Sequence, residues 1–547
     1  MSRSSAPSSA AEVRGPVRHR MGPAMAAMGI VGLVASLLPA RAETLSDALA
    51  KAYFNNPNLN AQRSTTRAAD ENIPIANSGY MPRVTASGDL GAQYQSFTGP
   101  SGVGAVSTGG SSLGGLGTTG TTVGTTTSTN TSPSTVAGTG SGGTFGLANS
   151  LGSNSGTSTA SNAARTAATG NTLATSDGTV LPRGAGISVS QTLFDGLRTT
   201  NNIKSAESNV FGSRETLRNV EQSVLQSGAQ SYMDVLRDTA ILDLRNSNIK
   251  VLEEQLRQTQ DRFKVGEVTR TDVAQAEASV AGSRADYFAA QSQLQNSIAS
   301  FRQVIGEQPT RLEPARPLDR GIPPSLENAI AVSQIEHPSI QAALHSVDVA
   351  SLQVKIAEGA LYPTLSLNGS AQQRYDVSNV GNSHAFVGSI VGSLSVPIYE
   401  GGASYASIRQ AKEQLGTAEF QVDVSRDNVR AAVISSWGLL VSSKAAVQAD
   451  QAQVNAAEIA LNGTREEARV GQRTTLDVLN AQQTLLNARV QLVGAQRDRV
   501  VATYAILASC GRLSASALSL RLQPYNPTVH FDQVKDKWFG LRTPDGR

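Results

Sequence analysis

Residues 470–478 read VGQRTTLDV, and residues 265–273, which lie 205 positions upstream, read VGEVTRTDV. Both copies follow V-G-x-x-T-x-x-D-V, and each lies between two long stretches without proline. A glycine followed by threonine and aspartate, ahead of an apolar repeat, is typical of one helix ending and another beginning. We therefore predict two helical hairpins that end at these motifs. Any helical hairpin needs such a turn, but the repetition indicates that the function lies at the hairpin ends.

A longer internal repeat surrounds the two motifs. At an offset of 281, segments 45–49, 56–59 and 82–85 match 326–330, 337–340 and 363–366; at 205, segment 193–196 matches 398–401 and Gly306 matches Gly511. Two constant offsets predict an internal duplication. The predicted divisions are a first repeat at 43–306, a proline-rich connector at 307–325, a second repeat at 326–511 and a C-terminal tail at 512–547.

The first repeat contains an insertion, because the two offsets differ by 281 − 205 = 76 residues. It covers about residues 98–181, which are almost entirely Gly, Ser, Thr, Ala and Asn. Such a composition buries too little apolar surface to fold. We expect a long flexible loop between two strands, either a tolerated expansion or a segment displayed on the surface.

The proline-free stretches predict long helices with a narrow apolar seam. Only 5% of the residues are aromatic and 16% are charged, which is unlike a large enzyme with a thick core. Apolar residues recur every seven positions, which predicts coiled-coil packing. These residues are Val235, Leu242, Ile249, Leu256, Phe263, Val273, Val280, Tyr287, Leu294 and Phe301, then Leu440, Val447, Val454, Leu461, Val478, Leu485 and Leu492. From Leu197 to Lys264 the helix would be ~100 Å long, which predicts the wall of a tube.

Alternating apolar and small or polar residues predict strands, most clearly at 386–398 and from Leu365 onward. This pattern is typical of barrel strands that face lipid, and a soluble sheet with one buried face shows it too. Each repeat supplies two predicted strands, so one chain supplies four. A closed membrane barrel needs at least ~8 strands. If a barrel forms, it must therefore be oligomeric.

Residues 1–42 are predicted to be an export signal. Arginines precede an apolar run at 24–38, and Ala40 and Ala42 offer a cleavage site. The run is shorter than the ~20 residues of a membrane-spanning helix. These residues carry five arginines and one glutamate, so the formal charge of +3 becomes 3 − 4 = −1 after cleavage. The charge therefore gives no indication of nucleic-acid binding.

The sequence contains no recognisable catalytic constellation. The five histidines do not stand at metal-ligand spacing with cysteine or carboxylates, and His337 and His345 are predicted to be solvated. No phosphate-binding loop, nucleophile elbow or dinucleotide motif is present. We therefore predict that the protein is not an enzyme and uses no metal or cofactor.

Two carboxylates recur at the hairpin ends, Asp272 and Asp477. Each is either the N-cap of its returning helix or part of a ring in an oligomer. Such a ring sets cation preference and supplies hydrogen bonds that hold an aperture closed. Arg473 stands where the first repeat has Val268, and it is the natural partner of Asp272 in the opposite hairpin.

The strand–strand–helix–helix unit, the pair Gly401-Gly402 and the stretch 470–481 resemble the TolC family of outer-membrane efflux proteins. The resemblance covers about residues 43–515, apart from the insertion. It implies a mainly α fold with β: a homotrimer whose twelve-stranded outer-membrane β-barrel continues as a periplasmic α-helical coiled-coil barrel. The implied function is a passive exit duct of a tripartite efflux or type I secretion system in a Gram-negative cell. Its implied partners are a periplasmic adaptor (membrane fusion protein), an inner-membrane pump of ABC or RND type, and outer-membrane lipid.

Site residues follow from the same resemblance. Asp477 and Asn480 would belong to the constriction ring, and Thr271, Asp272 and Arg473 to the network that holds the closed state. The adaptor-contacting ends would be Val265, Gly266, Thr269, Val470, Gly471 and Thr474. The family pattern has an acid where Asn480 stands and a tyrosine where Ala468 stands, so we expect a weaker cation ring and an aperture that opens more readily.

An exported structural coiled coil or adhesin that displays the insertion is the alternative function. The paired motifs and paired strands argue against it. Within the family, the unlipidated signal and the D-V-L-N-A stretch favour the type I secretion and general-efflux branch over the lipidated drug- or metal-efflux branch.

Overall fold

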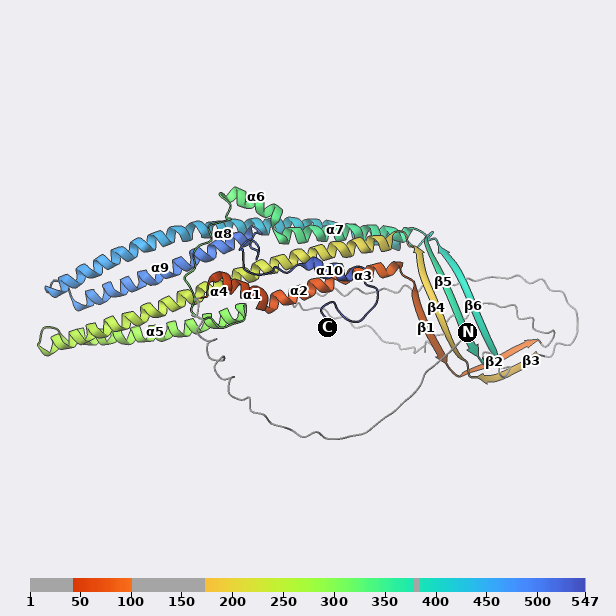
Figure 1. The fold of residues 1–547 in the computed structure, drawn as a ribbon, viewed down its shortest axis with the longest axis horizontal. Helices are drawn as coiled ribbons and strands as arrows, with labels where there is room; N and C mark the ends of the chain where they lie inside the picture. The colour runs from red at the N-terminus through yellow and green to blue at the C-terminus, as the bar shows by residue number, and fades with distance from the viewer. Residues whose placement is uncertain (1–42, 101–172, 377–382, 547) are drawn as a thin grey trace, which may run out of the picture. The chain divides into compact units, whose positions relative to one another are not determined.

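The computed structural model describes residues 43–100, 173–376 and 383–546 (Figure 1). The predicted signal at 1–42 and the middle of the insertion lie outside them. The described residues form two compact units: one holds residues 43–84, 189–369 and 390–546, and the other holds residues 85–100, 173–188, 370–376 and 383–389.

Two long helical hairpins dominate the first unit. Helices α4 (Arg198–Lys264) and α8 (Ala403–Arg469) have 67 residues each, and they return as α5 (Arg270–Ile305) and α9 (Thr475–Ser509). α4 and α8 begin 205 positions apart, as the sequence repeat predicts, and α4 contacts α9. Figure 1 shows both hairpin ends at the same end of this unit. The predicted hairpins are therefore confirmed, and the matching bounds support the proposed duplication.

Shorter helices brace the long ones. They are α1 (Leu45–Asn55), α2 (Pro57–Asp70) and α3 (Asn72–Asn77) in the first half, and α6 (Leu326–Glu336) and α7 (Pro338–Glu358) in the second. α1, α2 and α3 pack on α4, and α7 lies against both α4 and α8. Among the described helices, none is both long and apolar enough to cross a membrane.

Equivalent caps begin α2 and α7, each directly before a proline. The Asn56 side chain accepts a hydrogen bond from the Asn58 N–H at 3.0 Å, and His337 Nδ1 accepts one from the Ser339 N–H at 3.2 Å. His337 is buried, so the prediction that it is solvated is wrong. Burial lowers its pKa, which keeps the ring neutral and able to accept this bond at neutral pH.

The strands form one sheet of four and one of two. The larger sheet has the order β1 (Arg83–Leu90), β4 (Arg183–Phe194), β5 (Thr364–Tyr375) and β6 (His384–Ser395), and β2 (Gln93–Pro100) pairs antiparallel with β3 (Leu173–Val180). Strand β3 and the end of β2 lie in the insertion, so the prediction of a loop without structure is wrong at both ends. Backbone hydrogen bonds pair these two strands, although the sequence around them has the composition of a loop. β6 stops before Pro397, which cannot donate to a sheet.

The seven-residue repeat lies partly on the seam. Val454, Leu461, Val478 and Leu485 are buried together between α8 and α9, as predicted. In α4, Phe263 of the predicted series is exposed. The buried residues there include Asn248, Leu252 and Thr259. The difference arises because α4 contacts α5, α7 and α9, so its buried face follows several partners.

The tail beyond the second repeat packs on the first repeat's helices. The Tyr525 N–H donates to Tyr53 Oη of α1 at 2.9 Å, and the Ala515 N–H donates to the Glu221 carboxylate of α4 at 2.8 Å. Helix α10 (Pro527–Val534) then lies against α2. The tail therefore joins the two halves of the chain.

Candidate functional site: the hairpin ends

Each hairpin end is built by a left-handed glycine and a reciprocal threonine–aspartate cap. Gly266 has φ +81° and Gly471 has φ +78°, a conformation that other residues adopt at a cost of about 1–2 kcal/mol. In the first end, Thr269 Oγ1 accepts from the Asp272 N–H at 3.3 Å, while Asp272 Oδ2 accepts from the Thr269 N–H at 2.8 Å and its hydroxyl at 2.7 Å. These bonds form a capping box.

The second end repeats this geometry. Asp477 Oδ2 accepts from the Thr474 N–H at 3.0 Å and from the Thr474 hydroxyl at 2.9 Å, and the Asp477 N–H donates back at 3.2 Å. The N-cap is therefore the threonine in both turns, and the aspartate stands three residues later. The prediction that the aspartates are N-caps is corrected in this detail; their part in helix capping is confirmed.

The caps favour the ionised form of both carboxylates. Hydrogen bonds from the hydroxyl and the N–H of Thr269 lower the pKa of Asp272. The N–H and the hydroxyl of Thr474 likewise lower the pKa of Asp477. Both side chains therefore carry a full negative charge at neutral pH. Each aspartate can therefore cap its helix and also present a negative charge at the surface.

Each turn contains an ion pair between the preceding helix and the turn, and the positions of the cation and the anion are exchanged between the two turns. In the first, Arg262 Nε of the helix lies 2.7 Å from Glu267 Oε2 of the turn. In the second, Glu467 Oε2 of the helix lies 2.9 Å from Arg473 Nε of the turn. Positions 262 and 467 correspond at the offset of 205, so the two hairpins carry opposite charges there. Sequence analysis missed this reversal, although both charges stand in the sequence.

The predicted latch pair does not form within one described chain. Arg473 binds Glu467 of its own hairpin, and Asp272 binds Thr269 of its own turn. Thr271 and Asn480 lie on the surface. In the described residues, no hydrogen bond joins Arg473 to Asp272. Ala468, where the family pattern has tyrosine, lies partly buried against the apolar seam of α8 and α9.

The outermost residues of both ends are open to solvent. Val265 is 75% exposed and Val470 is 71% exposed. A Cβ atom added to Gly266 or Gly471 would have no neighbour within 4 Å. At each end one valine side chain is therefore exposed, and no other part of the described chain covers it.

Contacts just behind the ends join the two hairpins. Leu479 of α9 is buried with Leu252 of α4 and Val280 of α5. Beside it, Gln482 Nε2 donates to Asn248 Oδ1 of α4 at 3.2 Å, and Arg465 Nη2 donates to Gln482 Oε1 at 3.0 Å. Sequence analysis missed these contacts, because Leu479 and Asn248 each stand beside a member of the predicted seven-residue series.

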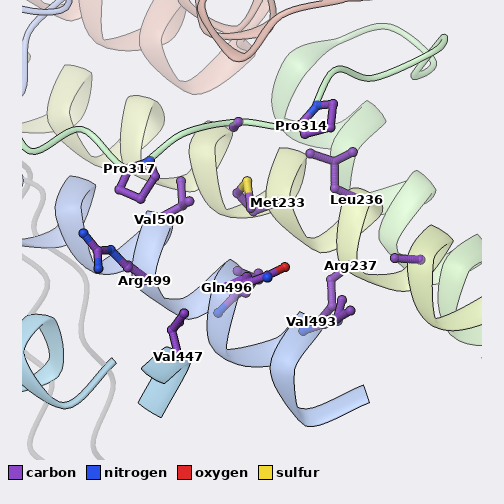
Figure 2. Close-up of a pocket in the computed structure, with 13 residues that line it drawn as sticks. Met233, Leu236, Arg237, Pro314, Pro317, Val447, Val493, Gln496, Arg499 and Val500 are labelled. Carbon is purple, nitrogen blue, oxygen red and sulfur yellow. The ribbon is translucent and has the colours of Figure 1, made fainter. Parts of the chain in front are cut away.

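A cavity of about 490 Å³ lies farther from the ends, where the connector crosses the hairpins (Figure 2). Its apolar lining includes Met233, Leu236, Pro314, Val493 and Val500. Within the described residues, no three His, Cys, Asp or Glu side chains gather in a way that could hold a metal ion. The lining offers packing surface and paired charges rather than reacting groups.

A shared carboxylate joins α4 to α9 beside this cavity. Arg497 Nε lies 2.8 Å from Asp234 Oδ1, and Arg237 Nη1 lies 3.2 Å from the same atom. Arg499 Nη2 lies 3.4 Å from Asp319 Oδ2 of the connector. Arg499 stands where the first repeat has Leu294 of the apolar series, at the offset of 205, and the connector gives this arginine a partner. The two hairpins are thus tied together by charge far from their ends.

We predict that Arg497→Gln lowers the free energy of unfolding by about 1.5–3 kcal/mol, because it leaves the half-buried Asp234 with one partner fewer. The control is Arg489→Gln, which lies on the same helix as Arg497. It removes an exposed pair with Glu458 of α8 and should cost less than about 1 kcal/mol. Chemical unfolding followed by circular dichroism measures both. Equal losses would show that Arg497 is no more important than a surface pair.

Comparison with known proteins gives one consistent result. The model of the family described as "Outer membrane efflux protein" matches residues 146–307 and 330–512. Outer membrane efflux protein BepC of Brucella suis biovar 1 (strain 1330) is 38% identical over 522 residues, which are 95% of this chain and 97% of BepC.

More distant relatives agree. Outer membrane protein TolC of Escherichia coli (strain K12) is 27% identical over 321 residues, which are 55% of this chain and 64% of TolC. The crystal structure of the Campylobacter jejuni CmeC outer membrane channel aligns with a TM-score of 0.63 at 15% identity, covering 90% of this chain and 89% of CmeC. That alignment shows a shared fold.

Proposed function

This chain belongs to the outer membrane efflux protein family, and from that premise we propose that it acts as a trimeric exit duct closed by its hairpin ends. It is an export channel of the outer membrane and not an enzyme. The alternative of a structural coiled coil or adhesin finds no support among the relatives. The observation that carries the proposal is the pair of matching capped turns, each at the end of a 67-residue helix.

The trimer is proposed from the sheet. One chain contributes four strands to its larger sheet, fewer than the ~8 that the smallest closed membrane barrels need. Large apolar side chains of β6, such as Ile390 and Leu394, are exposed in the single chain, as expected for strands that face lipid. Three chains would supply twelve strands to one barrel. Helices of ~100 Å would then extend into the periplasm.

The hairpin ends are proposed to bind a periplasmic adaptor, which links the duct to an inner-membrane pump of ABC or RND type. Val265 and Val470 offer exposed apolar contacts, and Gly266 and Gly471 leave room for a partner's backbone to approach. Thr269 and Thr474 hold the two exposed valines in place by capping the returning helices. Adaptor binding thus depends on a rigid turn with an uncovered tip.

Closure is proposed to use the opposite charges of the two hairpins. In a ring of alternating hairpins, Arg473 of one hairpin would face Asp272 of the next. The capping bonds of Asp272 use only Oδ2, so Oδ1 can accept from Arg473 of the facing hairpin. Asp477 and Asn480 would line the constriction, with Thr271 beside Asp272. Asn480 carries no charge, so this ring would attract cations less than one with a second acid.

We predict that Arg473→Gln raises the conductance of the closed channel severalfold, because it removes the cation that joins Asp272 of the facing hairpin. Single-channel recording in planar bilayers measures this change. The matched control is Arg469→Gln, which removes an exposed arginine paired with Glu466 and should leave conductance unchanged.

A second control separates the two partners of Arg473. Glu467→Gln breaks the pair within the turn and leaves Asp272 intact, so conductance should stay low. A conductance that rises with Glu467→Gln as much as with Arg473→Gln would assign the effect to the local pair. Unchanged conductance in Arg473→Gln would exclude the latch altogether.

We predict that Gly471→Leu abolishes export without lowering trimer yield. The leucine fills the space that a partner's backbone needs, and the strain of φ +78° costs about 1–2 kcal/mol in this turn alone. The control is Gly463→Leu on α8, where an added side chain also meets open space. Export of a pump substrate and trimer recovery from outer membranes are measured together. Normal export by Gly471→Leu would remove this turn from the adaptor contact.

Within the family, we propose the type I secretion and general-efflux branch. The support is the stretch Asp477–Ala481.

A further inference from the structure

The end of the chain presents an exposed aromatic cluster at one place on the first unit. Trp538 is 78% exposed, Phe539 is 74% exposed and Leu541 is fully exposed. Together with Met81 and Ile75, which are also exposed, they line a hollow of about 860 Å³. So many large apolar side chains in one surface patch indicate a binding partner.

The structure holds this segment in place through α10. His530 Nδ1 lies 3.0 Å from Asp70 Oδ2 of α2, and both side chains are buried. The Arg214 guanidinium lies 4.9 Å from the centre of the Phe531 ring. Asn77 Nδ2 donates to the Lys535 carbonyl at 3.4 Å. The aromatic residues are therefore presented by a docked helix.

The hollow lies where the helices give way to a strand. Tyr80, Met81 and Pro82 line it, and β1 begins at the next residue, Arg83. Val84 of β1 is exposed. This inference rests on the proposed insertion of the strands in the outer membrane: the start of β1 then marks the membrane surface, and the hollow lies at that level.

The chemistry of the cluster fits a phospholipid surface. Tryptophan and other aromatic side chains favour the headgroup region, and cations beside them attract anionic lipid. Lys535, Lys537 and Arg542 line the hollow, against Glu71 and Asp536. Lys535 pairs with Asp532 outside the hollow.

Two arginines at this level can bind phosphate groups. Within the described chain, neither Arg542 nor Arg83 forms an ion pair, and both are exposed. The Lys537 ammonium donates to the Arg542 carbonyl at 2.6 Å and so holds the turn that presents this arginine.

We propose that residues 535–543 form a lipid anchor at the periplasm-facing surface of the outer membrane. Trp538, Phe539 and Leu541 enter the boundary between headgroups and acyl chains, and Arg542 and Lys537 bind the phosphates of anionic phospholipids. The anchor fastens the tail, and through α10 the α2 and α4 helices, to the membrane.

Intrinsic fluorescence tests the anchor in the full-length protein, because the chain has only two tryptophans, Trp437 and Trp538. Trp437→Phe leaves Trp538 as the reporter. We expect its emission to fall roughly twofold or more in proteoliposomes of phosphatidylethanolamine and phosphatidylglycerol with brominated acyl chains, relative to unbrominated lipid. The matched control is Trp538→Phe: the remaining Trp437 packs against the cluster around Val433 and Ile506 and should not be quenched.

Arg542→Gln in the Trp437→Phe background tests the anionic headgroup. Quenching should be stronger with phosphatidylglycerol than in phosphatidylcholine alone, and Arg542→Gln should reduce that difference. An equal difference in both variants would overturn the role of Arg542.

Membrane insertion is measured separately, as resistance of the trimer to carbonate extraction. Extraction of the trimer would contradict the proposed channel itself. An inserted trimer whose Trp538 is not quenched would overturn the anchor alone; unquenched but blue-shifted emission would assign the hollow to a protein segment instead.

If Trp437→Phe fails to fold, Trp538→Cys carrying an environment-sensitive dye replaces it. Burial raises the pKa of the native Cys510 thiol to about 11, so Cys510 should stay unlabelled. A dye that reports water in anionic liposomes would likewise overturn the anchor.

Discussion

The reciprocal cap between threonine and aspartate is the interaction on which the proposed aperture depends. Asp272 and Asp477 each close a turn by accepting two hydrogen bonds from one threonine. This cap allows a 67-residue helix to reverse over five residues and keeps the tip uncovered. It also lowers the pKa of a carboxylate at the surface and so favours its charged form. Capping uses Oδ2 of Asp272, which leaves Oδ1 for the proposed latch.

The two halves repeat each other in backbone and differ in charge. Matching offsets extend from the helix bounds to the caps at Asn56 and His337. At the hairpin ends the ion pair is reversed, from Arg262 with Glu267 to Glu467 with Arg473. Each end carries one cation and one anion, and their order along the hairpin is reversed between the two copies. The copies therefore share a backbone and differ at their ends in the placement of charge.

Sequence patterns predicted the fold well where a local rule applies. The hairpins follow from the missing prolines, the turn motifs and the seven-residue repeat. Each of these signals depends only on residues that lie close together in the sequence. The pairing of β2 with β3 was missed, since backbone bonding between Gln93 and Val180 leaves no apolar signal. The buried face of α4 was partly misplaced because its partners come from six other helices.

The sequence by itself determined the two hairpins, their capped turns and the family resemblance, because these depend on residue order and spacing. Only the tertiary structure decided which residues meet across the halves. It placed Gln482 against Asn248, Arg497 against Asp234, and the tail's His530 against Asp70. The partners in these pairs are separated by more than 200 residues, and each pair forms only after helices from distant segments have packed. No spacing rule links such residues, since their distance depends on the packing of whole helices.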